Sequence, residues 1–338
     1  MNKEWQLDAI KLFRTGVVSD REISKIVKKP RSTVNDLLRK YRENLEITSA
    51  DVIVSNKVQE DVEVKCSGIF NIVTDNEKQN GTHLYIPDTQ CKTGISLNYL
   101  RYIGEYIVRK KPDVLIHGGD HADMESLSSY DKGKKSAEGK RVSRDIEVAI
   151  EGMKALLKPL YDLQQKELEM YGEIRYKPRM VLTLGNHEDR ITRYVNDTPE
   201  LEGFLSIDSL KYAEFGWEVI PFLTPIEIGG VFYCHYFQNV MTGKPLSGTA
   251  ANMLKVLGKS FTMGHRQQLD ITTRYLQADG TQQYGLIAGA CYEHEEHYKG
   301  VQGNHHWRGV VVKHRVKNGS YDPLFVSLDW LKEQYGKD

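Results

Sequence analysis

Metal-capable side chains follow short apolar runs at five places in the sequence. In chain order they are Asp88, Asp120, the pair Asn186-His187, His235 and His265. Each run is rich in Val, Ile, Leu, Phe or Tyr, as is typical of a buried strand. Carboxylates, amide oxygens and imidazoles are the ligands that divalent metals use in hydrolytic sites. Because α/β sheets build their sites where the carboxyl ends of strands meet, the spacing predicts one metal centre.

The runs belong to a pattern in which short strands alternate with amphipathic helices. Helices are predicted near 97–110 and 141–170, and strands at 83–88, 114–120, 180–189, 231–237 and 260–265. This alternation predicts a layered α/β domain over residues 81–338. Its last part, 271–338, is strand-rich and is expected to complete the sheets, without an assigned function of its own.

Residues 1–45 form a basic head, and residues 46–80 form an acidic linker. The head has eleven basic and six acidic residues, whereas 46–79 has three basic and seven acidic ones. Apolar residues at helical spacing predict three short helices in the head. The second opens with the capping-box pair Ser19 and Glu22, and Ile23, Ile26 and Val27 form its expected apolar stripe.

The head resembles the helix-turn-helix of resolvase and invertase DNA-binding domains, through the segment REISKIVKKPRSTV. Lys28 stands in the turn, where such motifs often place glycine. The resemblance implies that one group of side chains enters the major groove and another faces phosphates. The first group is Arg31, Ser32, Thr33 and Asn35, and the second is Lys28, Lys29, Arg39 and Lys40. The alternative is a helical bundle that docks to another protein.

The ordered motifs of the larger domain resemble the calcineurin-like metallophosphoesterase superfamily. They are D-x-Q at 88–90, G-D-x-x-D at 119–123, G-N-H-E-D at 185–189, the later strand-end His235 and G-H-x-Q at 264–267. The sequences of these motif segments look most like those of phage-encoded members, some of which are described as DNA repair exonucleases. The resemblance implies a layered β-sandwich flanked by helices and a centre of two divalent ions.

The family roles divide the predicted ligands into two metal positions that share Asp120. The first metal position takes Asp120, Asn186, His235 and His265. The second takes Asp88, Gln90, Asp120 and Gln267. The two glutamines depart from the family, which usually places histidines there. An oxygen-rich position favours Mn²⁺ over Zn²⁺, so we expect Mn²⁺, with Mg²⁺, Zn²⁺ or Fe²⁺ as alternatives, and weaker binding at the second position.

The resemblance gives His187 a role in catalysis rather than in metal binding. It implies that this imidazole protonates the leaving oxygen or stabilises its charge, while Asp120 bridges the two ions. Asp123, together with Glu188 or Asp189, is expected to orient such histidines as a hydrogen-bond acceptor. A further polar segment, His294-Glu295-Glu296-His297, lacks the spacing of a zinc protease and is expected to be a solvated loop.

Composition restricts the function classes without selecting one. The sequence has 40% hydrophobic and 27% charged residues, and the four cysteines are widely spaced, as expected in a reducing compartment. No apolar stretch is long enough to cross a membrane and no signal peptide is seen, so we expect a cytoplasmic protein, in the host of a phage, without a membrane partner. The partner expected is DNA, and a homodimer is left open.

We therefore expect a metal-dependent phosphodiesterase that acts on DNA. It is expected to be a nuclease with exonuclease activity. Two alternatives remain. In one, the enzyme hydrolyses nucleotides, phosphomonoesters or phosphoproteins, and the head docks a partner. In the other, the glutamines have silenced the centre and the protein is a DNA-binding factor without catalysis.

Overall fold

The computed structural model describes residues 20–30, 32–36, 38, 73–74, 80–129, 133–296 and 299–336. The chain divides into two compact units, Met1–Ser67 and Gly68–Asp338. The first of the three helices predicted in the head, for which Trp5, Ala9, Ile10, Leu12 and Phe13 supply the apolar spacing, lies outside the described residues. Among the helices that are described, none combines the length and the apolar character needed to span a bilayer.

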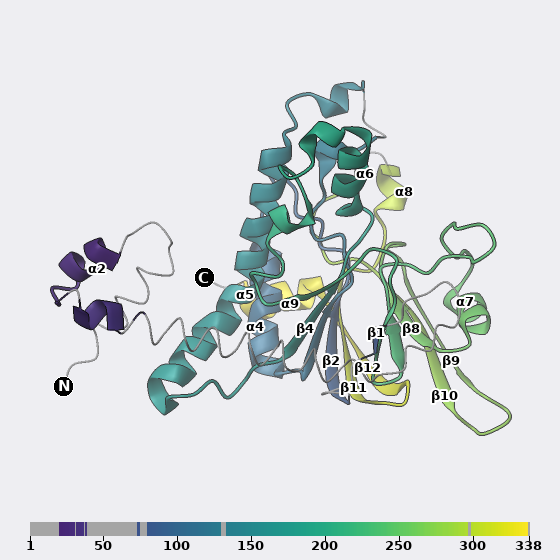
Figure 1. Cartoon of the computed structure of the whole chain (residues 1–338). Coiled ribbons are helices and arrows are strands. Elements are labelled where there is room, and N and C mark those ends of the chain that lie inside the picture. Colours follow the sequence, from purple (N-terminus) through teal and green to yellow (C-terminus); the bar gives the residue numbers. More distant parts are fainter. Residues whose placement is uncertain are drawn as a thin grey trace, which may run out of the picture. The chain divides into compact units, whose positions relative to one another are not determined.

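In the N-terminal unit, helix α2 (Asp20–Ile26) is followed by a turn and by a second helical stretch at 32–36 (Figure 1). Lys28 in the turn has a φ of 50°, the left-handed conformation that glycine adopts most easily. Ile23 and Val34 are fully buried. Ile26, expected on the same buried stripe, is instead 56% exposed, because α2 ends there and the chain turns away.

The larger unit is a mixed α/β structure built on two six-stranded sheets. Sheet A has the order β1-β6-β7-β8-β10-β9, with strands β1 (Val73–Thr74), β6 (Ile226–Ile228), β7 (Val231–Tyr233), β8 (Ser260–Met263), β9 (Leu269–Tyr275) and β10 (Gln282–Ala288). Sheet B has the order β12-β11-β2-β3-β4-β5, with strands β2 (Gly81–Ile86), β3 (Val114–His117), β4 (Arg179–Thr183), β5 (Glu218–Ile220), β11 (Gly309–Lys317) and β12 (Ser320–Ser327). Strand β1 lies inside the range expected as a linker and pairs in parallel with β6.

Alternating side chains of the strands fill separate cores on the two faces of sheet B. In β2, Leu84 and Ile86 face the helices, whereas Tyr85 faces sheet A. The cluster around Tyr85 also contains Tyr233 and Leu286 from sheet A, so the two sheets pack face to face. Strands that are buried on both faces are continuously apolar, which explains the unbroken apolar runs of the sequence.

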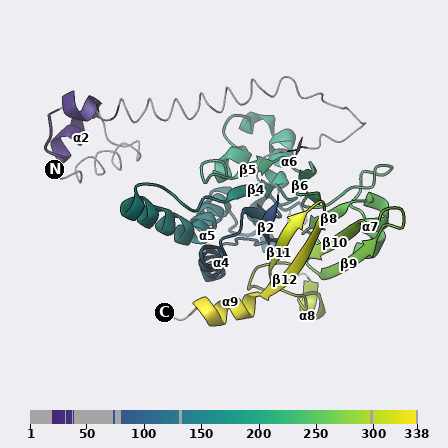
Figure 2. The ribbon, with the colours of Figure 1, turned by 90° about the horizontal axis from the view of Figure 1, so that it is seen from below.

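Helices cover both outer faces of the two sheets (Figures 1 and 2). Sheet B is covered by α4 (Asn98–Lys110), α5 (Val142–Tyr171) and α9 (Leu328–Tyr335), and sheet A by α7 (Ala250–Leu257). Gly104 allows α4 to approach α5 closely, since a Cβ there would lie 2.3 Å from the carbonyl oxygen of Leu156. The predicted helices at 97–110 and 141–170 thus correspond to α4 and α5.

Strand β11 connects distant parts of the chain. It pairs antiparallel with β2 on one side and with β12 on the other. Strands β2, β3, β4 and β5 run parallel to one another, and β7 and β8 run parallel in sheet A. The carboxyl ends of these parallel strands, and the loops that follow them, carry the polar residues singled out above.

Candidate metal centre

Loops directly after the strands carry the residues of the first metal position. Asp120 lies three residues after β3 and Asn186 three residues after β4. His235 and His265 each lie two residues after a strand, β7 and β8 respectively. Two strands of each sheet therefore contribute to one site, which lies beyond the carboxyl ends of these four strands.

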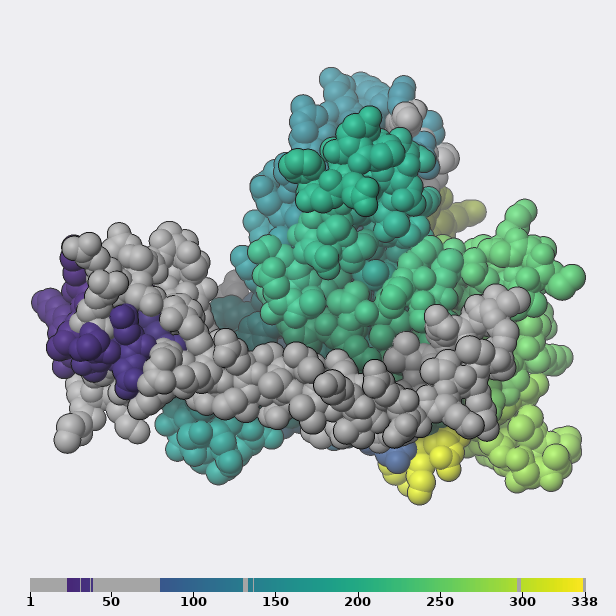
Figure 3. Space-filling view, viewed as in Figure 1, coloured from purple at the N-terminus to yellow at the C-terminus, as the bar shows by residue number. Residues whose placement is uncertain are grey.

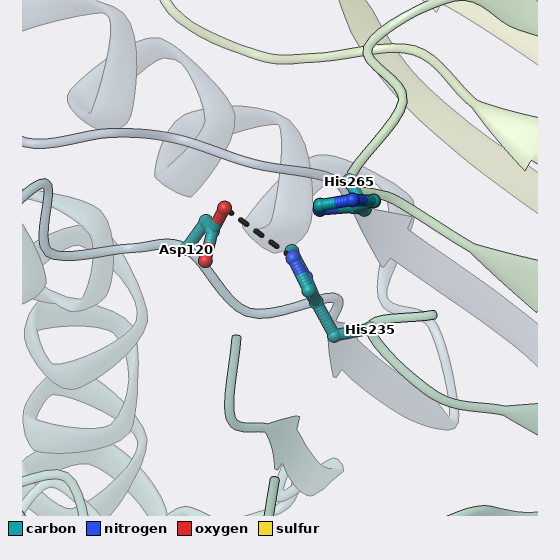
Figure 4. Close-up of side chains that lie close together, drawn as sticks. All are labelled: Asp120, His235 and His265. Atoms are coloured by element: carbon teal, nitrogen blue, oxygen red, sulfur yellow. Dashed lines mark ion pairs between the residues drawn. The ribbon is translucent and has the colours of Figure 1, made fainter. Parts of the chain in front are cut away.

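The first metal position brings its four side chains together. One ligand atom each from Asp120, His235 and His265 lies within 4.8 Å of the others. Figure 4 shows the three side chains close together. Asn186 Oδ1 is 3.0 Å from His235 Nε2 and 2.8 Å from His265 Nδ1. His235 Nδ1 hydrogen-bonds the Gly118 carbonyl oxygen at 2.8 Å, which leaves Nε2 facing the other ligands. This donor set of nitrogen and oxygen atoms suits a divalent transition metal.

Two residues predicted for the second metal position have buried oxygen atoms without a hydrogen-bond partner within the described residues. These atoms are Asp88 Oδ2 and Gln90 Oε1. Asp88 is fully buried and Gln90 is 1% exposed. Unpaired buried oxygens are costly unless a cation or water satisfies them, so these two fit an ion held by oxygen ligands.

Four of the predicted ligands have a left-handed backbone. The φ angles are 42° at Gln90, 49° at Asp120, 64° at His265 and 59° at Gln267. Each such residue costs on the order of 1 kcal/mol relative to an ordinary conformation, and such strain clusters at functional sites. The backbone is also crowded at Gly264, where a Cβ would lie 2.2 Å from Asp88 Oδ1.

The electrostatics of the centre are suited to a bound cation. Burial raises the pKa of Asp88 to about 6. Burial has the same effect at Asp120, but the His187 and His235 imidazoles hold the pKa of that carboxyl well below its ordinary value. Burial would lower the pKa of His235, yet Asp120 raises it to about 9. A cation at the centre would keep both carboxylates ionised and His235 neutral.

His187 lies beside the first metal position, and its side chain does not join the ligands. Its Nδ1 is 2.8 Å from Asp123 Oδ1, and its Nε2 is 3.7 Å from Asp120 Oδ2. Arg190 Nη2 lies 3.1 Å from the same Nε2. Asp123 therefore fixes the imidazole so that Nε2 and the Arg190 guanidinium point toward the centre together.

Arg190 and His187 belong to the part of the chain that opens α6 (Asp189–Asp197). The Arg190 guanidinium also donates to the carbonyl oxygens of Asp123 and Met124, at 2.8 and 3.3 Å. These contacts join α6 to the loop after β3. In Figure 3 the green surface of the residues around α6 lies against the blue surface of residues that follow β3.

Glu188 and Asp189 do not contact the site histidines in the ways that we expected. The Glu188 carboxylate, fully buried, accepts hydrogen bonds from four backbone N–H groups and from the Tyr212 hydroxyl. Burial raises the pKa of Glu188, and the backbone donors oppose that effect. Asp189 pairs with Arg193 at 3.0 Å. Glu188 thus joins the loops that carry Asp120 and Asn186, and orients ligands through the backbone.

The segment 294–296, expected to be a solvated loop, is buried at two of its residues. His294 is 8% exposed and Glu296 is 5% exposed, and His294 Nε2 lies 2.8 Å from Glu296 Oε1. Glu296 Oε2 and Asp123 Oδ2 each lie 3.5 Å from the Lys92 ammonium. The solvated-loop prediction is therefore wrong, because the chain between β10 and β11 packs against the loops of the site. His297 lies outside the described residues.

Gln267 accepts hydrogen bonds from two residues of the connection between β10 and β11. Its Oε1 is bonded by the Tyr292 hydroxyl at 2.9 Å and by the Lys299 ammonium. Sequence reasoning missed Lys299, Lys92 and Arg190. Only Arg190 has a local signal, because it follows the G-N-H-E-D motif three residues after His187. The two lysines reach the site through long-range packing.

An apolar cavity of about 480 Å³ lies on the outer side of sheet A, near the first metal position. It is lined by residues that include Phe232, Tyr236, Phe237 and Leu246. The Tyr236 ring lies 4.6 Å from the His265 ring, centroid to centroid. Tyr236 therefore lines the cavity and also contacts His265, one of the predicted metal ligands.

In the N-terminal unit, the residues expected to contact DNA are exposed where they are described. Lys28 and Lys29 follow α2, and Ser32, Thr33 and Asn35 lie on the second helical stretch. The other expected contacts, Arg31, Arg39 and Lys40, lie outside the described residues.

Comparison with known proteins gives one distant relative. The chain is 26% identical over 202 residues to the "Gene 54 protein" of Mycobacterium phage L5, a span that covers 58% of this chain and 73% of that protein. No family model matches the chain.

Proposed function

We propose that residues 81–338 form a calcineurin-like metallophosphoesterase domain and that the protein is a metal-dependent phosphodiesterase acting on DNA. The observation that carries this proposal is the convergence of Asp120, Asn186, His235 and His265 on one point, with His187 alongside. The packing of two sheets between layers of helices supports the same assignment. The phage relative is consistent with a phage protein that acts in the host cytoplasm.

Divalent ions bound at the two positions, Mn²⁺ by preference, would polarise the phosphoryl oxygens and lower the pKa of the attacking water. Side chains of the protein would donate hydrogen bonds to the phosphate from the side opposite the ions. Arg190 Nη2 lies 3.1 Å from His187 Nε2, so a phosphate oxygen that replaced this contact could accept from the guanidinium and from Nε2 once the imidazole is protonated. In its protonated form, His187 would donate its Nε2 proton to the leaving oxygen, with Asp123 holding Nδ1.

DNA as substrate is proposed from the N-terminal unit. The exposed Ser32, Thr33 and Asn35 share a helical stretch with the buried Val34, as a recognition helix requires. The left-handed turn at Lys28 precedes that stretch. We infer a helix-turn-helix that binds phosphates through Lys28 and Lys29 and brings DNA to the metal centre.

The test of the catalytic part is hydrolysis of linear double-stranded and single-stranded DNA, beside a chromogenic phosphodiester, with Mn²⁺ or with chelator. Asp120→Asn and His187→Ala should each abolish hydrolysis of every substrate. His305→Ala, a change at an exposed histidine, is the matched control and should retain it. Hydrolysis that persists in Asp120→Asn would refute the proposed centre, and cleavage of the chromogenic ester alone would point to another phosphoester substrate.

The test of the DNA part uses the full chain with Lys28→Glu and Lys29→Glu combined. The variant should cleave the chromogenic ester at the normal rate. Its DNA cleavage should weaken, and the slope of DNA affinity against salt should fall by about 1 for each phosphate that the head no longer binds. Lys154→Glu combined with Lys166→Glu, at exposed lysines of α5, is the control for the same change of charge. Unchanged DNA binding in the double variant would remove the head from DNA recognition.

A further inference from the structure

The second metal position has a lysine next to one of its predicted ligands. Lys299 donates through its ammonium to Gln267 Oε1, and the same nitrogen lies 3.4 Å from the Tyr292 hydroxyl. The Tyr292 hydroxyl also donates to Gln267 Oε1, at 2.9 Å. The amide oxygen that would bind an ion at this position is thus already held by two donors, one of them a cation.

The two metal positions differ in charge and in ligand type. The first has two imidazoles, an amide oxygen and the Asp120 carboxylate. The second has no imidazole among its predicted ligands, and the only carboxylate of its own is Asp88. Lys299 is half-buried beside it; burial lowers the pKa of its ammonium, and the nearby Glu296 and Asp88 carboxylates oppose that shift. A divalent ion at the second position would therefore meet a like charge at close range.

We propose that the Lys299 ammonium supplies the positive charge at the second position, so that the centre holds one tightly bound divalent ion, at the first position. This inference rests on the proposed phosphodiesterase function. Lys299 then binds a non-bridging phosphate oxygen from the side opposite the tightly bound ion, where a second metal would otherwise bind it. The orphaned Asp88 Oδ2 and Gln90 Oε1 take a second ion only at high metal concentration.

The test is the stoichiometry of Mn²⁺ on the full chain, measured by calorimetric titration and by elemental analysis after gel filtration. The wild type should bind one ion tightly, with a second at least a hundredfold more weakly. Lys299→Met removes the ammonium and frees Gln267, so its second ion should bind at least tenfold more tightly. Two neighbouring Mn²⁺ ions give a spin-coupled resonance spectrum, which should appear in Lys299→Met at metal levels where the wild type shows an uncoupled ion.

Three further variants make the outcome decisive. Lys299→Arg keeps the charge and should behave as the wild type, and Lys332→Met controls for loss of a lysine elsewhere. Lys299→Gln is the second neutral variant, in case Lys299→Met does not fold. Two equally tight ions in the wild type, or a second ion that stays weak in both neutral variants, would overturn the role of Lys299.

Failure of the proposed function has a different signature. Asn186→Ala should weaken the tight ion of the wild type, because Asn186 belongs to the first position alone. If the wild type binds no ion tightly, the metal centre itself is refuted, and this inference with it. If the wild type binds one ion that Asn186→Ala weakens, but the Lys299 variants change nothing, only the role of Lys299 is refuted.

Discussion

Glu188→Gln should destabilise the protein far more than a change of one side-chain atom suggests. Glu188 Oε1 accepts from the N–H groups of His121 and Ala122, and Oε2 accepts from those of Asp120 and Gly185. An amide keeps one oxygen and turns an NH₂ group toward the other two donors. Two buried N–H groups then lose their acceptor, at about 1–3 kcal/mol each, so we expect a loss of about 4 kcal/mol.

The assay is urea unfolding followed by circular dichroism, with chelator present so that metal binding does not contribute. Asp189→Asn makes the same chemical change at the next residue, where the carboxylate pairs with Arg193, whose side chain is 54% exposed. That control should lose less than about 1 kcal/mol. Tyr212→Phe removes one of the five donors to Glu188 and should lose about 1 kcal/mol. If Glu188→Gln lost no more than Asp189→Asn, the role of Glu188 in joining the two loops would be refuted.

Two further substitutions test the core and the centre. Lys313→Met should stabilise the fold by about 1–3 kcal/mol at pH 7, because the fully buried side-chain nitrogen hydrogen-bonds only to the Tyr233 and Thr262 hydroxyls among the described residues, and the tyrosine rings around it offset only part of the cost of burial. Burial lowers the pKa of Lys313, so the folded wild type binds fewer protons than the unfolded chain and its stability rises with pH. Urea melts at pH 7 and pH 9 should show that rise in the wild type and a flatter profile in the variant, and equal slopes would contradict it. Gly185→Ala should weaken the tight Mn²⁺ at least tenfold in a calorimetric titration, since its Cβ would lie 2.1 Å from Asp120 Oδ1; unchanged affinity would show that the loop can move aside.

The strands and their polar ends could be predicted from local sequence. The apolar runs before Asp88 and Asp120 are continuous because strands β2 and β3 are covered on both faces, and consecutive residues are enough to show this property. The two long helices were predicted for the same reason, since helical spacing of apolar residues is also a local signal. The mixed α/β class of the larger unit followed from their alternation.

The residues that the sequence did not reveal reach the site through distant parts of the chain. Lys299 contacts Gln267 only because the connection from β10 to β11 crosses the site. His294 and Glu296 look like a solvated polar loop in sequence, and they are buried because each satisfies the other. Ile26 shows the opposite error, because an apolar residue at the end of a helix need not be covered. Periodicity does not report these contacts, which depend on how loops pack.

The place of β11 in sheet B has a consequence for the order in which the protein can fold during synthesis. Every predicted metal ligand precedes residue 268, so a nascent chain contains the full ligand set before β11 leaves the ribosome. Until then β2, the strand that leads to Asp88, has one unpaired edge, because its antiparallel neighbour is β11. An open edge of apolar strand invites pairing with other chains. Metal-binding competence is therefore expected late in biogenesis, and a ribosome-stalled chain that ends before residue 309 should aggregate rather than bind Mn²⁺.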